Sequence, residues 1–560
     1  MKFCFSTLGC TERSLEEVLS LAKKYSIDAL ELRGLDGVMD NRKIAALAPE
    51  KRDETLAKFA ECGVKPLVLG TSCKFHDAEK LDESLEEGYR SIDIAENLGF
   101  RAIRVFGNNI KGDENECLDR IAGGISLLCE YAVGKGVDVL LETHGDVNTA
   151  ERLGAVAKIC GKYENFGLIW DICHTRLTYG ENWRTFCDDF FELIRHVHLK
   201  DVTPEGLKLP GEGDLPIAEM VKYLANKGYE GYFSLEWEKK WHPELPQIEE
   251  ALDSLFGLFY IKRKDIRVRD PFIVLEDGIF YLYATTGART YSYYYSRDLE
   301  NWLEGGVAFE IPEDFWAYRD VWAGEVHKYK GKFYLFVSLL GKNGLRGTQI
   351  AVSDSPRGKF IPLAPRAVTP LEQSCIDGTL YVHEGKPYIF YSHDWPDNYV
   401  EEKSAYVGEL WAAELTEDLT AIKGEPWLIF GSDESPISKK TPHHITYDGK
   451  KTMRYGSDAP WLQPLSNGSL LLTWSPYLQN NYVVLPVISK SGSIRGPWEH
   501  LPEPLFDQNG GHAMFFRDKN DRNIMCIHAP EKNLLERACL YEVEEENGEL
   551  KIVKEIKGEQ

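Results

Sequence analysis

The stretch Phe166-Gly-Leu-Ile-Trp-Asp-Ile-Cys-His174 is an apolar run that ends in a carboxylate and an imidazole. Similar runs lie on both sides of it between Lys2 and Leu258, separated by segments of helical period such as 14–24 and 82–99. Eight strand-and-helix units in roughly 250 residues are the number and size of a (β/α)8 barrel. The predicted strands are 2–7, 29–34, 65–71, 102–107, 138–144, 166–175, 195–202 and 231–237.

A doubly wound open sheet is the competing fold for this half. Such a sheet usually carries a glycine-rich turn after its first strand, whereas this turn reads Leu8-Gly-Cys-Thr11. We therefore predict a TIM barrel over residues 1–258.

Four consecutive strands of this barrel end in acidic or histidine side chains, at the rim where barrel enzymes hold their active sites. Carboxylates that converge on one mouth repel each other unless a cation lies between them. Three oxygen ligands and one nitrogen suit Mn²⁺, Mg²⁺ or Co²⁺, with Zn²⁺ left open. The candidate metal ligands are Glu142, Asp171, His198 and Glu236.

At these residues the first half resembles the sugar phosphate isomerase/epimerase superfamily, whose xylose-isomerase-like barrels include ketose 3-epimerases and inosose dehydratases. The resemblance rests on Glu142, on Asp171 with His174, on the segment His196-Val-His-Leu-Lys-Asp201, and on Glu236. It implies a divalent metal on the four candidate ligands, with Glu142 and Glu236 also acting as the acid/base pair.

Proton removal next to a metal-bound carbonyl begins isomerisation, epimerisation and dehydration alike, so all three outcomes stay open. His174 and Lys200 are the candidate substrate-binding residues, with a capping or solvent-facing role as the alternative for His174. The endonuclease branch is disfavoured, because strand two offers only Glu31 and strand three only His76 as further zinc ligands.

The second half changes to aromatic and β-branched sequence and repeats a strand, turn, strand unit five times. The turns read Asp-Gly, Lys-Gly, Glu-Gly, Asn-Gly and Asn-Asp. Five repeats of blade length predict a five-bladed β-propeller over residues 265–560, with a long insertion in the third repeat. The leading polar residues of the repeats are Asp270, Glu325, Asp377, Asp458 and His512.

The first strand of every propeller blade lines the central axis, so these five side chains are predicted to converge. Carboxylates gathered there raise each other's pKa, which serves glycoside hydrolysis because that reaction needs a protonated acid and an ionised base. Trp322 and Trp461 are candidate sugar-stacking residues, with core packing as the alternative.

Here the chain resembles glycoside hydrolase family 43 over about residues 265–560. The matching pieces are Arg269-Asp-Pro271, Glu325-Val-His-Lys-Tyr329, Ile376-Asp-Gly378 and Gly511-His512 with the strand to His528. The resemblance implies Asp270 as general base, Asp377 as the residue that orients and tunes the acid, and a carboxylate of the fourth blade as general acid.

The position of that acid departs from the family pattern. Many members have Glu-Gly-Pro, whereas this chain has Asp458-Ala-Pro460. Because Asp is one methylene shorter, proton delivery requires a shifted substrate or help from Glu325. His512 or His528 is the candidate ligand of a central Ca²⁺ or water.

Composition excludes several classes of function. The chain has 65 Lys and Arg against 89 Asp and Glu, a net charge of −24, which repels nucleic acids and anionic lipid surfaces. No stretch approaches the roughly 18 apolar residues of a membrane span. Twelve cysteines without a CxxC pair indicate reduced thiols and a cytoplasmic protein.

The sequence thus predicts a bifunctional carbohydrate-active enzyme, in which a metal-dependent isomerase, epimerase or dehydratase barrel precedes a glycosidase-like propeller for arabino- or xylo-type glycosides. Its expected partners are sugars or oligosaccharides, and not nucleic acids or membranes. The alternative is a single activity, with a propeller that only binds carbohydrate or mediates assembly. A homo-oligomer is left open.

Overall fold

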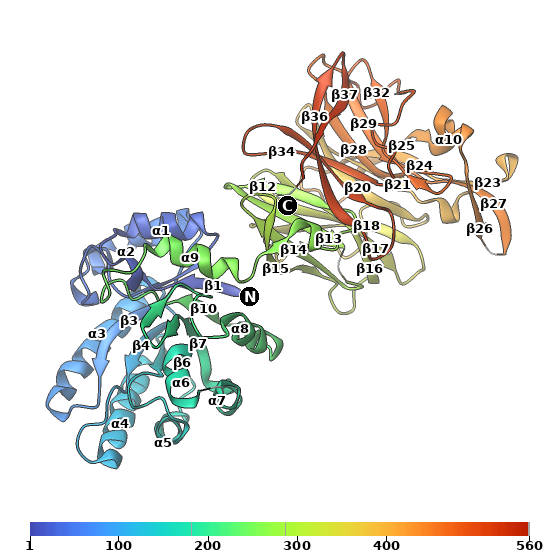
Figure 1. Ribbon diagram of the computed structural model, residues 1–560. Coiled ribbons are helices and arrows are strands. Elements are labelled where there is room, and N and C mark those ends of the chain that lie inside the picture. The colour runs from blue at the N-terminus through green and yellow to red at the C-terminus, as the bar shows by residue number, and fades with distance from the viewer. Residues whose placement is uncertain (181, 286, 448, 558–560) are drawn as a thin grey trace. The chain divides into compact units, whose positions relative to one another are not determined.

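The computed structural model describes residues 1–180, 182–285, 287–447 and 449–557. These residues form two compact units, 1–259 and 260–560. The first unit contains parallel strands surrounded by helices, and the second consists almost entirely of antiparallel strands (Figure 1).

Eight parallel strands form the centre of the first unit, in the order β1-β10-β7-β6-β5-β4-β3-β2. A parallel bridge between Ser6 and Glu31 joins β1 to β2 and closes the barrel. The strands are almost wholly buried, because helices cover their outer side and side chains fill the interior. Their bounds are β1 Lys2–Phe5, β2 Ala29–Leu32, β3 Lys65–Lys74, β4 Ala102–Phe106, β5 Asp138–Glu142, β6 Phe166–Asp171, β7 Ile194–Leu199 and β10 Tyr232–Leu235.

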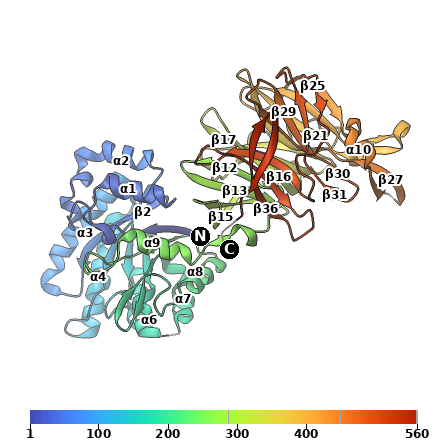
Figure 2. The ribbon, with the colours of Figure 1, turned by 45° about the horizontal axis from the view of Figure 1, so that its top comes forward.

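Amphipathic helices surround these strands in the views of Figures 1 and 2. The first of them, α1 (Leu15–Lys24), begins at a capping box in which Ser14 and Glu17 satisfy each other's backbone N–H groups. The others are α2 Arg52–Glu61, α3 Leu81–Leu98, α4 Glu114–Ala132, α5 Ala150–Cys160, α6 Ile172–Tyr179, α7 Trp183–Phe190, α8 Ile217–Asn226 and α9 Ile248–Gly257. A small hairpin, β8 (Asp201–Thr203) and β9 (Gly206–Lys208), follows β7.

The predicted barrel is confirmed, but the sixth strand is shorter than its apolar run suggested. It ends at Asp171, whose side chain accepts the backbone N–H groups of Cys173 and His174 and so begins α6. His174 therefore lies on a helix and not at a strand end.

Five sheets of antiparallel strands form the second unit and confirm the five-bladed propeller. The first strands of successive blades contact each other around a ring that β12 and β34 close. The first blade consists of β12 Phe272–Glu276, β13 Ile279–Thr285, β14 Thr290–Ser296 and β15 Asn301–Glu310, with β11 Ile261–Lys262 added, and the second of β16 Ala317–Tyr329, β17 Lys332–Gly341, β18 Arg346–Ser353 and β19 Ile361–Pro362. The third blade consists of β20 Cys375–His383, β21 Lys386–His393, β24 Glu409–Leu415 and β25 Ile422–Gly431, and the fourth of β28 Asp458–Pro464, β29 Leu470–Ser475, β32 Leu485–Ser489 and β33 Glu499–His500. The fifth blade consists of β34 Gly511–Arg517, β35 Asn523–Ala529, β36 Arg537–Glu546 and β37 Glu549–Glu555.

The insertion in the third repeat forms a sheet of its own, in the order β22-β23-β27-β26. It extends from the edge of the propeller in both views (Figures 1 and 2). Its elements are β22 Tyr399–Val400, β23 Ala405–Val407, α10 Pro436–Lys440, β26 His443–Tyr447 and β27 Lys450–Tyr455, and a short hairpin of β30 Tyr477–Leu478 and β31 Asn481–Tyr482 lies in the fourth blade.

Four of the first strands contain a bulge near their start, and the same position in the first blade lies just before β12. In every blade one residue at this position, here called the bulge residue, has a left-handed φ of 44° to 58°. The backbone N–H of this residue donates to a side chain; in four blades the acceptor belongs to the second strand of the preceding blade, and in the fourth blade it is Asp377. The five bulge residues are Asp270, Ala323, Asp377, Ala459 and His512.

The predicted equivalence of the five leading residues is therefore wrong in two blades. Trp322, Ile376 and Asp458 hold equivalent positions, because each pairs with the equivalent residue on the second strand of its own blade. Asp458 thus lies one residue before the bulge residue of its blade, and Glu325 lies two residues after that of the second blade. The spacing between repeats does not reveal this offset, because it does not show at which position of the strand the extra residue of the bulge lies.

No helix formed by the described residues is long and apolar enough to cross a membrane. All twelve cysteines are free thiols, and most of them are buried in the two cores.

Candidate active sites

The mouth of the barrel collects the four predicted metal ligands at the carboxyl ends of β5, β6, β7 and β10. Glu142, Asp171, His198 and Glu236 are each no more than 2% exposed, and each offers a ligand atom within 4.8 Å of the others. Glu142 Oε2, Asp171 Oδ2 and His198 Nδ1 are buried without a hydrogen bond. Buried oxygen and nitrogen atoms that form ion pairs but no hydrogen bonds fit the ligands of a divalent cation.

Two cationic side chains, Arg104 and Lys200, form ion pairs with these carboxylates. Arg104 Nη1 lies 3.1 Å from both Glu142 Oε2 and Glu236 Oε1, and Lys200 Nζ lies 2.8 Å from Asp171 Oδ2 and 2.7 Å from Glu236 Oε2. Burial alone would raise the pKa of Glu142, but Arg104 lowers it to about 2. The lowered pKa values of Glu142 and Glu236 keep these two carboxylates ionised, as metal ligands must be.

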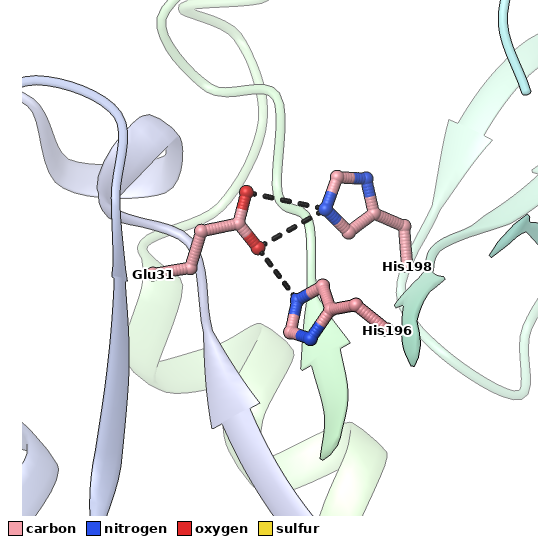
Figure 3. A group of neighbouring side chains, drawn as sticks. All are labelled: Glu31, His196 and His198. Atoms are coloured by element: carbon pink, nitrogen blue, oxygen red, sulfur yellow. Dashed lines mark hydrogen bonds and ion pairs between the residues drawn. The ribbon is translucent and has the colours of Figure 1, made fainter. Parts of the chain in front are cut away.

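The carboxylate of Glu31, on β2, lies behind this site. It accepts from Nε2 of both His196 and His198, at 3.0 Å each (Figure 3). It also accepts from Ser234 Oγ at 2.9 Å. Because Nε2 of His198 donates to Glu31, the Nδ1 atom faces Glu142 and Glu236. Sequence reasoning considered Glu31 only as a possible further zinc ligand; its place inside an otherwise apolar strand was the available signal.

His174 stands next to the predicted site without joining the four ligands. Its Nε2 is 3.9 Å from Asp171 Oδ2, and its ring contacts that of His144 at 4.3 Å between centroids. His144, His174 and Glu142 form a second group of closely spaced ligand atoms. The other predicted substrate-binding residue, Lys200, is held by three carboxylates at the mouth.

A cavity of about 330 Å³ opens above these residues. Glu142, Glu236 and Glu238 form its acidic side. Its remaining charged lining consists of Arg33, Lys74 and Arg104, from the ends of β2, β3 and from β4.

A second cavity, of about 610 Å³, lies at the axis of the propeller. It is lined by the predicted catalytic residues Asp270, Asp377 and Asp458, together with Trp322 and His512. Asp394, which follows β21, adds a fourth carboxylate that sequence reasoning missed, although it ends an apolar strand as the other site residues do.

Asp270 is surrounded by basic groups. Its Oδ1 lies 3.1 Å from His512 Nδ1 and 3.4 Å from His528 Nδ1. The backbone N–H of Asp270 donates to His528, whose Nε2 is 2.6 Å from Glu531. These contacts hold the Asp270 carboxylate in place at the axis.

Three other carboxylates of this cavity have raised pKa values. Burial, and then the charges of Asp458 and Asp270, raise the pKa of Asp377 well above its usual range. Burial likewise raises the pKa of Asp458, which accepts from the Tyr482 hydroxyl at 3.2 Å. Burial and Asp458 raise the pKa of Asp394 to about 7. The cavity therefore contains acids whose protonated forms are favoured by burial.

Two predicted propeller residues lie elsewhere. Among the described residues that line the cavity, neither Glu325 nor Trp461 is found. Glu325 pairs with His327 at 2.8 Å, and Trp461 packs against Phe272 and His327. Trp461 lies two residues after the bulge residue of its blade. Its side chain packs between the first strands of neighbouring blades and does not face the cavity.

Aromatic and basic side chains cover the rim of the cavity. Trp322 is 37% exposed, and the Arg346 guanidinium stacks on its ring at 4.0 Å. The insertion contributes Arg454, which lies 4.9 Å from the Trp395 ring and 4.4 Å from that of Tyr477. Among the described residues, the three groups of closely spaced metal-ligand side chains all belong to the barrel, and none includes His512 or His528.

The two folds and their sites define a protein that joins a sugar isomerase-type barrel to a glycoside hydrolase-type propeller. Residues 19–258 match the family model of the xylose isomerase-like TIM barrel, and residues 264–548 match that of the glycosyl hydrolases family 43. The chain belongs to glycosyl hydrolase family 43, with a xylose isomerase-like barrel fused before that domain. Both predicted resemblances are confirmed.

Individual relatives align with one half each. The fructoselysine 3-epimerase of Shigella flexneri is 29% identical over 259 residues, covering 42% of this chain and 90% of the epimerase. The inosose isomerase of Halalkalibacterium halodurans is 27% identical over 280 residues, covering 45% and 93%. The solved endo-arabinase of Bacteroides thetaiotaomicron is 34% identical, covers 52% of this chain and 99% of its own, and superposes with a TM-score of 0.47.

Proposed function

We propose that the protein is a bifunctional carbohydrate enzyme. Its barrel is a divalent-metal-dependent isomerase or epimerase for a ketose or related sugar, and its propeller hydrolyses arabino- or xylo-type glycosides. The observation that carries the proposal is the presence of two cavities with separate carboxylate sets, one in each unit. A dehydratase outcome for the barrel remains within the same chemistry, since it begins with the same proton removal.

In the barrel, Glu142, Asp171, His198 and Glu236 would hold the metal, which when bound polarises the substrate carbonyl. One of Glu142 and Glu236 takes the proton from the carbon next to that carbonyl, and the other returns a proton to complete an epimerisation or isomerisation. Lys200 and His174 bind substrate oxygen atoms, and Glu31 keeps His198 oriented. Relatives that are an epimerase and an isomerase support this class of reaction.

In the propeller, Asp270 accepts a proton from the attacking water, and Asp458 gives a proton to the leaving oxygen, so that one water is consumed per bond cleaved. Asp377 accepts the backbone N–H of Ala459, next to Asp458, at 3.0 Å and so positions the acid. Trp322 offers an aromatic face to the sugar.

One observation favours a second candidate, in which the propeller only binds carbohydrate or mediates assembly. The side chain of Asp458 is shorter than the Glu found at this position in many relatives, and its carboxylate already accepts a hydrogen bond from the Tyr482 hydroxyl. In that case the barrel holds the single activity.

The test is a screen of the whole protein, supplemented with Mn²⁺, Mg²⁺ or Co²⁺, against aryl arabinofuranosides, aryl xylosides and free ketoses. We expect hydrolysis of at least one glycoside and conversion of at least one ketose, the latter dependent on metal. Ketose conversion without any hydrolysis would favour the single-activity alternative. Ketose conversion that persists in metal-free protein would contradict the ligand assignment.

A cytoplasmic location is also proposed, because all twelve cysteines are free. The net charge of −24 supports sugars as partners over nucleic acids and anionic membranes.

A further inference from the structure

The basic side of the barrel cavity has no role in the proton transfer proposed above. Arg33, Lys74 and Arg104 come from three consecutive strands, β2, β3 and β4, whereas the candidate metal ligands come from β5, β6, β7 and β10. Arg104 is ion-paired with Glu142 and Glu236. Arg33 and Lys74 therefore remain as the cavity-lining cations that form no ion pair with a candidate metal ligand among the described residues.

Arg33 is the residue that distinguishes this cavity from an ordinary polar one. It is 7% exposed, and its guanidinium donates to Met39 O and to Ser72 Oγ, each at 3.0 Å. It forms no ion pair with any carboxylate of the described chain. The charge of Glu87 acts on Arg33, but its carboxylate accepts the Ser72 backbone N–H at 2.6 Å.

The lack of a side chain at Gly70 leaves room for the side chain of Arg33. A Cβ atom at Gly70, on β3, would lie 2.4 Å from Arg33 Cδ, so the glycine is needed for the arginine to lie where it does. Burial, and then the nearby charge of Arg104, lower the pKa of Arg33 to about 10. A buried guanidinium next to another one, without a carboxylate of its own, is costly unless a ligand brings the negative charge.

Lys74 lies beside this guanidinium at the end of β3. Its side chain is exposed and lines the same cavity, and it makes no ion pair within the described part of the chain. Ser72 and Asn108 add neutral hydrogen-bonding groups to the same wall. Two cations and two neutral polar groups on one wall suit a compact anion, which accepts several charge-assisted hydrogen bonds at once.

We propose that Arg33 and Lys74 bind an anionic group of the barrel's substrate, a phosphate ester or a sugar carboxylate, and so select acidic sugars over neutral ones. The inference rests on the proposed barrel reaction and names its substrate class. Phosphate and carboxylate share the chemistry that the two side chains recognise, and the experiment separates them.

The test is isothermal titration of the whole protein with two unreactive probes, inorganic phosphate for a phosphate ester and gluconate for a carboxylate. We expect wild-type protein to bind at least one probe, and Arg33→Gln to bind it at least about 10-fold more weakly. Lys74→Gln should weaken binding by about 3-fold or more, and because Lys74 is exposed its loss does not threaten the fold. The probe that binds identifies the source of the anion.

The matched control is Arg101→Gln, an exposed arginine just before β4 at the opposite end of the strand. It should bind the probe as wild-type protein does. The proposal is overturned if neither probe binds at 10 mM (roughly the upper range of weak anion sites), or if wild-type protein and both cavity variants bind with equal affinity.

Turnover separates this proposal from the barrel reaction on which it rests. Ketopentose 5-phosphates and ketouronates are compared with the corresponding neutral ketoses. Equal kcat/KM for anionic and neutral sugars rejects the anion site and retains the reaction. Probe binding that Arg33→Gln abolishes, with no turnover of any sugar by wild-type protein, retains the anion site and rejects the reaction.

Discussion

At the scale of single residues, the barrel site depends on an acid that is not one of the four candidate metal ligands but contacts one of them, His198. Glu31 is fully buried, and the charges of His198 and His196 lower its pKa despite its burial. Its carboxylate accepts from His198 Nε2 and Ser234 Oγ. It therefore sets which nitrogen of His198 faces the proposed metal.

Glu31→Gln should reduce the affinity of the protein for Mn²⁺ by about 10- to 100-fold, because the amide no longer enforces the Nδ1-free tautomer of His198. Titration calorimetry with Mn²⁺ measures this directly. Glu50→Gln, an exposed acid outside the site, is the control and should bind Mn²⁺ as wild-type protein does. Unchanged Mn²⁺ affinity in Glu31→Gln would refute the role given to Glu31.

A second residue-scale prediction concerns pH and the propeller. Burial and Asp458 raise the pKa of Asp394 from its usual 3.8 to about 7. The folded protein therefore binds a proton there that the unfolded chain has released, so stability falls as pH rises from about 4 to about 7. Asp394→Asn should remove this loss, raising the Tm relative to wild-type protein at pH 8 and much less at pH 5.

Thermal unfolding of both proteins at the two pH values measures the difference. Asp354→Asn, which changes an exposed acid of the same unit, should shift the Tm equally little at both. A Tm difference for Asp394→Asn that is the same at pH 5 and pH 8 would show that Asp394 keeps an ordinary pKa.

At the scale of strands and turns, the first strands of the propeller are shaped by their bulges. Each bulge places a residue with positive φ beside the axis, and two of these residues are the acids Asp270 and Asp377. Asp tolerates this backbone region better than most residues, whereas β-branched residues are rare there. This backbone conformation thus explains how the first and third blades direct carboxylates into one cavity.

Ala323 occupies the same position in the second blade, with φ of 44°. Ala323→Val should lower the free energy of unfolding by about 2 kcal/mol, because a β-branched side chain is strained at this φ. Ala323→Gly should lower it little or not at all, since glycine adopts this conformation freely. Urea unfolding followed by tryptophan fluorescence checks both, and equal losses in the two variants would contradict the bulge conformation.

Much of this element-level structure could be predicted from the sequence. Eight apolar runs predicted the barrel, and the turns at Asp277-Gly278, Lys330-Gly331 and Glu384-Gly385 have the positive φ values that tight hairpins need. The end of β6 and the positions of Glu325 and Asp458 could not be predicted, because a side-chain cap and a bulge shift the register without changing the pattern of apolar residues.

The candidate sites were predictable to a similar extent. The four barrel ligands could be named because each ends a strand of a fold whose active face is known. Glu31 and Asp394 were missed because their roles depend on neighbours far away in sequence, His198 for the first and Asp458 for the second. Glu325 was misplaced because Ala323, and not an acid, occupies the position eight before the turn glycine that Asp270 and Asp377 occupy in their blades.

At the scale of the whole molecule, the two proposed activities depend on different groups. The clusters of metal-ligand side chains found among the described residues lie in the barrel, whereas the propeller cavity combines carboxylates with histidines and arginines. Removal of divalent metal by EDTA should therefore abolish ketose conversion and leave at least about 80% of glycoside hydrolysis, since acid/base hydrolysis requires no metal. Parallel assays of one EDTA-treated sample measure both, and Mn²⁺ should restore the lost activity. Equal loss of both activities would contradict separate sites.

The central claim is that one chain carries two independent catalytic sites. The most direct measurement tests two variants, each in both activity assays. Asp270→Asn should reduce glycoside hydrolysis at least about 100-fold, because the general base is lost, and leave ketose conversion unchanged. Glu142→Gln should abolish ketose conversion and leave hydrolysis unchanged. If either variant lowers both activities to the same extent while the protein remains folded, or if neither variant changes its assigned activity, the account of two sites is wrong.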